Sequence, residues 1–309
     1  MSAGKVRHGI TVLMSTYNGE KYLREQLDSL MNQTDVDVSV LIRDDGSKDA
    51  TIAIIEEYIK KYSNISLIKG DNCGVAWSFW KLLQVAPENE YYAFCDQDDI
   101  WDSDKLKVAI DRLQEYENSR PGLYYSMTRL VESDGRREII QKPTEYEMHI
   151  PTFPQLVMEN TATGCTMAWN KELNDIAKTV DVEYLRMHDH LLFLICMYVG
   201  GNVYFDTIPH ISYRQHEHNV IGGRKGIKKY ATSIKKYICK GSGLVEQAVQ
   251  LMNMNNGMQS VDRNIEFLEQ IKVYKKARLE QKLKIFRKVK QTGVLKNICI
   301  KGLIVLKRF

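Results

Sequence analysis

The chain has 309 residues, enough for one large domain or two ordinary ones, and its 44% hydrophobic content is compatible with a well-filled core. Its six cysteines form no CxxC pair and have no short regular spacing, which argues against a zinc knuckle or a disulfide framework and favours a reducing compartment. We find neither a signal-like apolar core nor an apolar run close to the roughly 20 residues of a membrane span, so we expect a cytoplasmic protein without a transmembrane helix.

The charge is distributed unevenly along the chain. Residues 224–309 hold 21 Lys and Arg against 5 Asp and Glu, a balance of +16, whereas residues 1–223 hold 22 against 34, a balance of −12. We therefore expect two parts with a boundary near residue 223. The acidic part is suited to a cation or a polar small molecule, and the basic part to an anionic surface.

The first hundred residues alternate between strand and helix patterns. The predicted strands are 10–14, 36–42, 65–68 and 91–95, and the predicted helices between them are 22–31, 52–62 and 75–85. This alternation predicts an α/β fold that is Rossmann-like, with a mostly parallel central sheet and helices on both faces. In such a fold, ligand-binding loops lie at the carboxyl ends of the strands.

The later part of the chain has a different character. Residues 123–169 are strand-like but less regular, and residues 182–199 indicate a helix. From 261 to 289, apolar residues recur at steps mostly of three and four among many Lys and Arg, which predicts a basic amphipathic helix or helical hairpin. Two uses remain open for this C-terminal extension: docking on the anionic inner face of the cell membrane, or an oligomerisation surface with solvated lysines.

Three carboxylates, Asp96, Asp98 and Asp99, follow the strand at 91–95 within four positions. Their mutual repulsion would raise a carboxyl pKa, and a bound divalent cation would offset it. An EF-hand is excluded because Trp101 stands where that loop needs Gly and Lys107 where it needs Glu. Mg²⁺ or Mn²⁺ shared with phosphate oxygens fits better, since it typically takes only one or two carboxylates. The alternative is a solvated acidic turn.

A second acidic turn, residues 44–49, follows the predicted strand at 36–42 and precedes a helix. Asp and Ser cap helix N-termini and Gly turns the chain, so a purely structural turn is one interpretation. Adjacent Asp44 and Asp45 allow another, in which one acid caps the helix and the other accepts a hydrogen bond from a ligand N–H.

Four ordered motifs together resemble the inverting family 2 glycosyltransferases of GT-A fold. They are Ser15-Thr16-Tyr17-Asn18, Asp44-Asp45-Gly46-Ser47 with Asp49, Asp96-Gln97-Asp98-Asp99, and His188-Asp189. A closer likeness is to bacterial rhamnosyltransferases of the rhamnan-building type. It rests on FCDQDDIW (94–101), GCTM (164–167) and YRQH (213–216). The resemblance covers about residues 8–222 and leaves the basic region outside.

The resemblance implies roles for five residues in donor binding. Thr16 and Tyr17 are expected to line the nucleotide base pocket, and Asp44 to accept the N3–H of uracil or thymine. Asp96 is expected to meet the ribose. Asp98 is expected to hold the Mg²⁺ or Mn²⁺ ion that bridges the diphosphate.

The resemblance also implies a catalytic base at Asp189; the alternative is that this residue only caps a helix. His216 is expected as a further metal or phosphate contact, and Arg214 nearby as a weaker candidate for a phosphate or acceptor contact, unless the two form an ordinary surface pair. Asp99 is a weaker candidate for a phosphate or acceptor contact. Trp101 is expected either to stack on an acceptor sugar or to pack in the core.

The implied function is metal-dependent inverting transfer of a sugar to a saccharide hydroxyl in cell-surface polysaccharide synthesis. The favoured donor is dTDP-L-rhamnose, and the alternative donor is a UDP-hexose. The expected acceptor is a polyprenyl-linked saccharide. A nucleotidyltransferase would need a glycine-rich phosphate loop with a basic residue after the first strand. Residues 15–19, which follow that strand here, contain neither a series of glycines nor a basic residue. Nucleic-acid binding is disfavoured because aromatic residues are sparse among the lysines. A dinucleotide oxidoreductase is excluded because no GxGxxG follows a strand.

Overall fold

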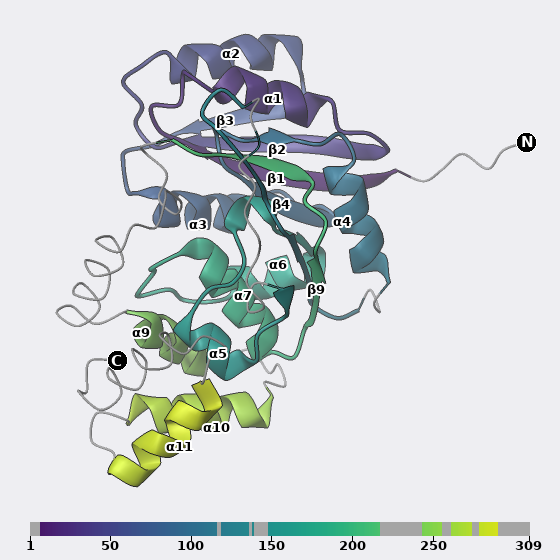
Figure 1. The fold of residues 1–309 in the computed structure, drawn as a ribbon. Coiled ribbons are helices and arrows are strands. Elements are labelled where there is room, and N and C mark those ends of the chain that lie inside the picture. Colours follow the sequence, from purple (N-terminus) through teal and green to yellow (C-terminus); the bar gives the residue numbers. More distant parts are fainter. Residues whose placement is uncertain are drawn as a thin grey trace, which may run out of the picture.

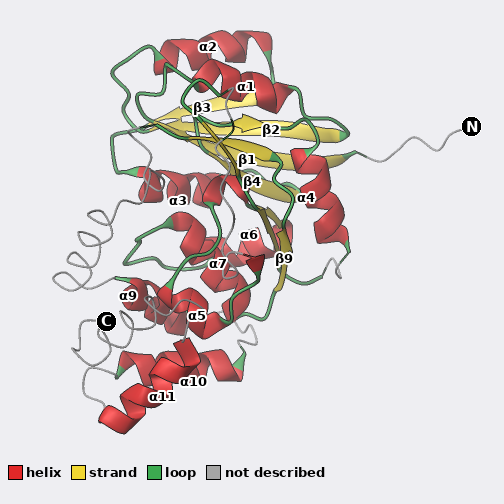
Figure 2. Cartoon of the chain, in the orientation of Figure 1, coloured by secondary structure: helices red, strands yellow, loops and turns green. Residues whose placement is uncertain are grey.

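The computed structural model describes residues 7–115, 119–135, 138, 148–216, 243–254, 261–273 and 278–289. Its strands are β1 (His8–Thr16), β2 (Val36–Asp44), β3 (Ile65–Lys69), β4 (Tyr91–Cys95), β5 (Ile100–Trp101), β6 (Gly122–Ser126), β7 (Arg129–Val131), β8 (Ala168–Asn170), β9 (Asn202–Asp206) and β10 (Ile211–Arg214). Seven of them form a central sheet in the order β3-β2-β1-β4-β8-β6-β9 (Figure 2). Only β8 runs antiparallel to its neighbours there. A small second sheet has the order β5-β10-β7.

The helices cover both faces of the central sheet (Figure 1). They are α1 (Leu23–Met31), α2 (Thr51–Lys61), α3 (Val75–Val85), α4 (Lys105–Gln114), α5 (Phe153–Met158), α6 (Lys171–Lys178), α7 (His188–Tyr198), α9 (Leu244–Val249), α10 (Asp262–Lys272) and α11 (Leu279–Val289), with 3₁₀ turns η2 (Gly164–Thr166) and η3 (Gln250–Asn253). Apolar residues of α1, α2 and α4 form one core cluster, and those of α3, α6 and α7 form another. Side chains of β1 alternate between the two, with Val12 and Met14 in the first and Leu13 in the second, as the pleat requires.

The α/β architecture expected from the sequence is confirmed, with two local differences. The helix expected at 182–199 begins only at His188, because Met187 has extended backbone angles (φ −145°, ψ 132°). The region expected to be strand-like, 123–169, also contains α5. That helix begins with a capping box in which Thr152 and Gln155 exchange hydrogen bonds, and Pro154 stands in its first turn.

The basic C-terminal helices pack against the rest of the molecule. Phe267, Leu268, Ile271, Ile285 and Val289 are buried in the same core cluster as α7. In Figure 1, α10 and α11 lie on the far side of α5 and α9 from the sheet. No helix among the described residues has the length and apolarity to cross a bilayer. The expected boundary near residue 223 falls within 217–242, outside the described residues.

Candidate active site

The candidate site lies where parallel strands β1, β2 and β4 end. Thr16 pairs in register with Asp44 and Met14 with Cys95, so the motifs that follow these strands emerge at the same edge. Asn18 joins two of the loops: its N–H donates to Ser47 Oγ (2.9 Å) and its Oδ1 accepts from the Lys48 N–H (2.9 Å).

Gln97 holds the loop after β1 against the loop after β4. Its side-chain oxygen accepts from the Tyr17 N–H (2.9 Å) and its amide nitrogen donates to the Tyr17 carbonyl (3.1 Å). A Cβ at Gly19 would lie 2.2 Å from Gln97 Oε1, so a larger residue there would displace the Gln97 amide. The Tyr17 ring remains 46% exposed and is available to a ligand. The sequence assigned no role to Gln97; its only signal was the position between the acids.

Asp44 is buried and its acceptor positions are filled. One oxygen accepts from the N–H groups of Gly46 (3.1 Å) and Ser47 (2.8 Å), and the other from the hydroxyls of Thr16 (3.0 Å) and Ser47 (2.6 Å). A carboxylate offers about four acceptor positions, so a nucleobase N–H would have to displace one of these donors. Thr16, itself buried, therefore orients Asp44.

Asp45, the neighbouring acid, has more acceptor capacity. Oδ1 accepts from Arg43, which forms a buried ion pair with it, and from the Cys73 N–H (3.0 Å). Among the described residues, Oδ2 accepts only the Gly74 N–H (2.9 Å). Burial acts to raise the pKa of Asp45, but the bonds from Arg43, Cys73 and Gly74 outweigh it and lower the pKa. Asp45 is thus an ionised carboxylate with room for one more donor.

Asp98 and His216 meet at the same edge. Asp98 Oδ2 and His216 Nε2 are 2.6 Å apart, with 19% and 14% of their side chains exposed. The His216 ring also stacks on Tyr22, with centroids 5.3 Å apart. A carboxylate oxygen and an imidazole nitrogen that converge at a solvent-accessible edge fit a divalent cation such as Mn²⁺. Mg²⁺ prefers oxygen ligands, so it would be bound by the carboxylate together with phosphate oxygens of the donor.

Arg214 does not present its guanidinium as a phosphate contact. It is only 1% exposed, its Nε donates to the Asp98 carbonyl (2.8 Å), and Nη1 donates to the Ser133 carbonyl (2.9 Å). Nη2 forms an ion pair with Glu25, and its backbone N–H donates to Asp99 Oδ1 (3.1 Å). The expected phosphate role is corrected: Arg214 is bound internally and fixes the backbone that carries the acids.

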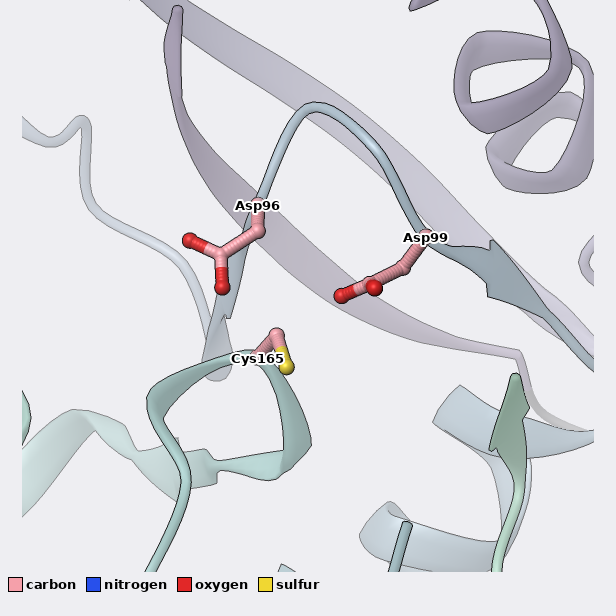
Figure 3. Close-up of side chains that lie close together, drawn as sticks. All are labelled: Asp96, Asp99 and Cys165. Atoms are coloured by element: carbon pink, nitrogen blue, oxygen red, sulfur yellow. The ribbon is translucent and has the colours of Figure 1, made fainter. Parts of the chain in front are cut away.

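Asp96, Asp99 and Cys165 approach one another on the inner side of this loop (Figure 3), with ligand atoms all within 4.8 Å. Burial and then the charge of Asp98 raise the pKa of Asp99 well above its usual range, and burial keeps the Cys165 thiol protonated by raising its pKa. A buried thiol is a poor ligand for a hard cation. Asp99 is fully buried, so a direct phosphate or acceptor contact is not supported; Asp96 is half-buried and more accessible.

Trp101 belongs to the core. It is 3% exposed, and the Lys105 ammonium lies 3.6 Å from the centroid of its ring. Of the two roles expected for Trp101, the structure shows core packing and does not support stacking on an acceptor sugar, because the ring is buried and its face is covered by a cation from the same chain.

Asp189 lies in the first turn of α7 and is 2% exposed. Its Oδ1 accepts from the His190 N–H (2.7 Å), and a Cβ at Gly164 would lie 3.4 Å from Oδ2, so that glycine leaves room beside the carboxylate. Burial raises the pKa of Asp189 to about 6. Burial, then the charges of Asp98 and Asp189, raise the pKa of Asp96 to about 7. Asp189 is thus electrostatically coupled to the acidic loop, and it is a stronger proton acceptor than an ordinary carboxylate.

Comparisons with known proteins agree with this geometry. The family model described as "Glycosyl transferase family 2" matches residues 11–167. The protein named dTDP-rhamnosyl transferase RfbG, from Shigella flexneri, is 34% identical over 226 residues, which are 70% of this chain and 75% of that protein.

Two solved structures share the fold. Mannosyltransferase PcManGT from Pyrobaculum calidifontis, in complex with GDP-Man and Mn²⁺, has a TM-score of 0.58 and 15% identity, covering 98% of this chain and 75% of that one. S. aureus TarS 1–349, in complex with UDP-GlcNAc, has a TM-score of 0.51 and 19% identity, covering 91% and 79%. The GT-A fold expected from the sequence is confirmed. With the family match spanning about half of its length and the acids of the motifs gathered at one sheet edge, the chain belongs to glycosyl transferase family 2.

Proposed function

We propose that this glycosyltransferase is a metal-dependent inverting enzyme that transfers L-rhamnose from dTDP-L-rhamnose to a hydroxyl of a saccharide. The rhamnosyl assignment is supported by the name of the 34% identical Shigella relative. The mechanism is supported chiefly by one observation: the buried carboxylate of Asp189 lies beside Gly164, and the next residue, Cys165, approaches Asp96 and Asp99 of the acidic loop after β4.

Donor binding is assigned to the loops after β1, β2 and β4. The exposed Tyr17 ring stacks on the base, and Asp96 meets the ribose. The base N3–H is accepted by Asp44, as the family motif implies, or by Asp45, which has the spare acceptor position. Asp44→Asn and Asp45→Asn separate these assignments: the residue that meets the base gives the larger loss of nucleoside diphosphate affinity in calorimetry.

Asp98 and His216 are the residues we assign to the metal, and a bound Mg²⁺ or Mn²⁺ would neutralise charge that develops on the leaving diphosphate. The two side chains already converge, with Asp98 Oδ2 2.6 Å from His216 Nε2. Arg214 keeps Asp98 in place by binding its carbonyl oxygen.

Asp189 is the proposed general base. It takes the proton of the acceptor hydroxyl while that oxygen forms a bond to C1 of the sugar from the face opposite the nucleotide. The bond from C1 to the diphosphate oxygen breaks, and the nucleoside diphosphate leaves with the electron pair. A single displacement of this kind inverts the configuration at C1.

A donor screen tests the substrate assignment. Release of nucleoside diphosphate is measured with Mg²⁺ or Mn²⁺ on dTDP-L-rhamnose, UDP-glucose, UDP-galactose and UDP-GlcNAc. We expect dTDP-L-rhamnose to give the highest rate and chelation by EDTA to abolish it. A higher rate with a UDP-hexose would establish the alternative donor and reject the rhamnosyl assignment.

Asp189→Asn tests the base assignment. The amide keeps the acceptor for the His190 N–H but cannot take a proton, so we expect transfer to fall by about 100-fold or more with donor affinity unchanged. Normal turnover in this variant would refute the role of Asp189.

A further inference from the structure

Helix α7, which carries Asp189, is held at both ends by residues that lie between 247 and 264. At its C-terminal end, the Met197 carbonyl accepts from Asn264 Nδ2 (2.8 Å) and the Tyr198 carbonyl accepts from the Val261 N–H (3.1 Å). The last carbonyls of a helix need partners from outside its own hydrogen-bond ladder, and here Asn264 of α10 and Val261, the residue before α10, donate to two of them.

At the N-terminal end, the completely buried side chain of Gln247 in α9 joins α7 to the segment that precedes it. Its Nε2 lies 3.0 Å from His190 Nδ1, and its Oε1 accepts from the N–H groups of Arg186 (2.6 Å) and Met187 (3.1 Å). Three residues later, Gln250 bonds to both backbone groups of Tyr184: Oε1 accepts the N–H (3.2 Å), and Nε2 donates to the carbonyl (2.8 Å).

The partners determine the orientation of every group in this arrangement. His190 Nε2 is 2.7 Å from the Leu156 carbonyl, which only accepts, so Nε2 carries the proton. In the neutral ring Nδ1 must then accept, and it accepts from Gln247 Nε2. The amide oxygen of Gln247 is thereby directed at Arg186 and Met187. Only a side chain with a donor and an acceptor side by side satisfies all three neighbours.

These contacts reach the residue next to the proposed base in the chain, His190, and Met187, two residues before it. The His190 N–H is the donor to Asp189 Oδ1, and the His190 ring is anchored by Gln247. The Gln247 Oε1 also accepts a hydrogen bond from the N–H of Met187, the residue that precedes α7. A shift of the amide would therefore move both the backbone that leads into the first turn of α7 and the ring next to Asp189.

We propose that Gln247, assisted by Gln250, is a positioning residue for catalysis, which makes the C-terminal region part of the catalytic apparatus. This rests on the proposed role of Asp189. General bases must be held close to the proton that they abstract, and a misplacement of about 1 Å costs as much as 100-fold in rate. A region that sequence alone assigned to a membrane or to partner subunits therefore also fixes the position of the base.

Gln247→Met tests the proposal, since methionine preserves the approximate size and removes both polar groups. We expect kcat for nucleoside diphosphate release from the preferred sugar nucleotide to fall by about 10- to 100-fold. The Kd for dTDP with Mn²⁺ should change less than about twofold, because the nucleotide loops are untouched. Hydrogen exchange in peptides that cover 184–190 should accelerate, because the Arg186 and Met187 N–H groups lose their acceptor.

Gln26→Met is the matched control, because Gln26 is also completely buried but lies on α1, where its amide contacts only Ser29 among the described residues. We expect it to leave kcat and exchange in 184–190 unchanged. Should Gln247→Met fail to fold, Gln250→Met carries the test: a several-fold lower kcat at unchanged dTDP affinity supports the proposal. Normal kcat in a folded Gln247→Met protein, alongside an inactive Asp189→Asn, overturns this inference and leaves the proposed function standing. An active Asp189→Asn removes the proposed function and this inference together.

Discussion

Burial of a carboxylate is the feature of Asp189 that most affects the chemistry of the site. Burial raises its pKa to about 6, so it is mostly ionised at pH 7 and accepts a proton more readily than a solvated aspartate. We expect kcat/KM to fall about tenfold for each pH unit below pH 6, because the protonated form cannot act as a base. Initial rates between about pH 4.5 and 8.5, at fixed metal concentration, measure this limb. A rate that is constant down to pH 5 would contradict the assignment.

Arg214 illustrates how a residue type alone can mislead. An arginine near an acidic motif suggests phosphate binding, but here the guanidinium binds the Asp98 and Ser133 carbonyls and the Glu25 carboxylate. The sequence does not distinguish an arginine that faces a ligand from one that faces its own chain, because the distance along the chain between the arginine and the acidic motif is compatible with both.

Arg214→Lys should therefore destabilise the fold. Lysine keeps the charge but cannot reproduce the forked contacts, so we expect a loss of about 2 to 4 kcal/mol in the free energy of unfolding, measured by urea titration. Arg24→Lys, in an exposed ion pair with Glu57, is the control and should leave the urea midpoint unchanged. Equal midpoints for the two variants would show that the buried contacts of Arg214 contribute little.

At the scale of elements, the periodic patterns predicted the α/β units because each strand and helix buries a continuous apolar face. The helix predicted at 182–199 was partly wrong. Its first six residues include Tyr184, Arg186 and Met187, whose backbone groups are bound by the glutamines of α9 and η3. Contacts from about sixty residues away thus override the local preference for helix.

The basic helices offer a test of where their apolar residues lie. Phe267 in α10 is 1% exposed and packs edge-on to Phe153 of α5, so Phe267→Ala should cost about 3 to 5 kcal/mol in the free energy of unfolding. Val273, just after α10, is 58% exposed, and Val273→Ala should change the stability by less than about 0.5 kcal/mol. Thermal and urea unfolding measure both. If both substitutions changed the free energy of unfolding by similarly small amounts, the apolar face of α10 would be free to bind another partner.

For the molecule as a whole, we propose that the positive charge of residues 224–309 attracts the enzyme to the anionic inner face of the membrane, where a polyprenyl-linked acceptor would lie. The buried apolar residues of α10 and α11 leave charge as the main attraction from these helices. Each basic residue near such a surface adds about 1 kcal/mol. An oligomerisation surface is the competing use of the same region.

Vesicle sedimentation of the full chain tests this attraction. We expect binding to anionic vesicles at about 0.1 M salt, its loss near about 0.5 M, and no binding to neutral vesicles, because salt screens surface charge. Replacing exposed Arg263, Lys272 and Arg287 with Gln should weaken binding. Salt-insensitive binding would contradict an electrostatic origin, and a self-association that rises with concentration, without vesicle binding, would favour oligomerisation.

Local patterns in the sequence were enough to predict the α/β class, the family and the edge of the sheet where the acids gather. These follow from local periodicity and from motifs at strand ends, which parallel strands bring to the same edge. Long-range packing in the folded chain, by contrast, places Trp101 in the core, turns Arg214 inward, fills the acceptor positions of Asp44 and brings Gln247 to the helix of the proposed base. Such properties depend on which distant groups occupy the same space, and spacing along one chain does not encode that.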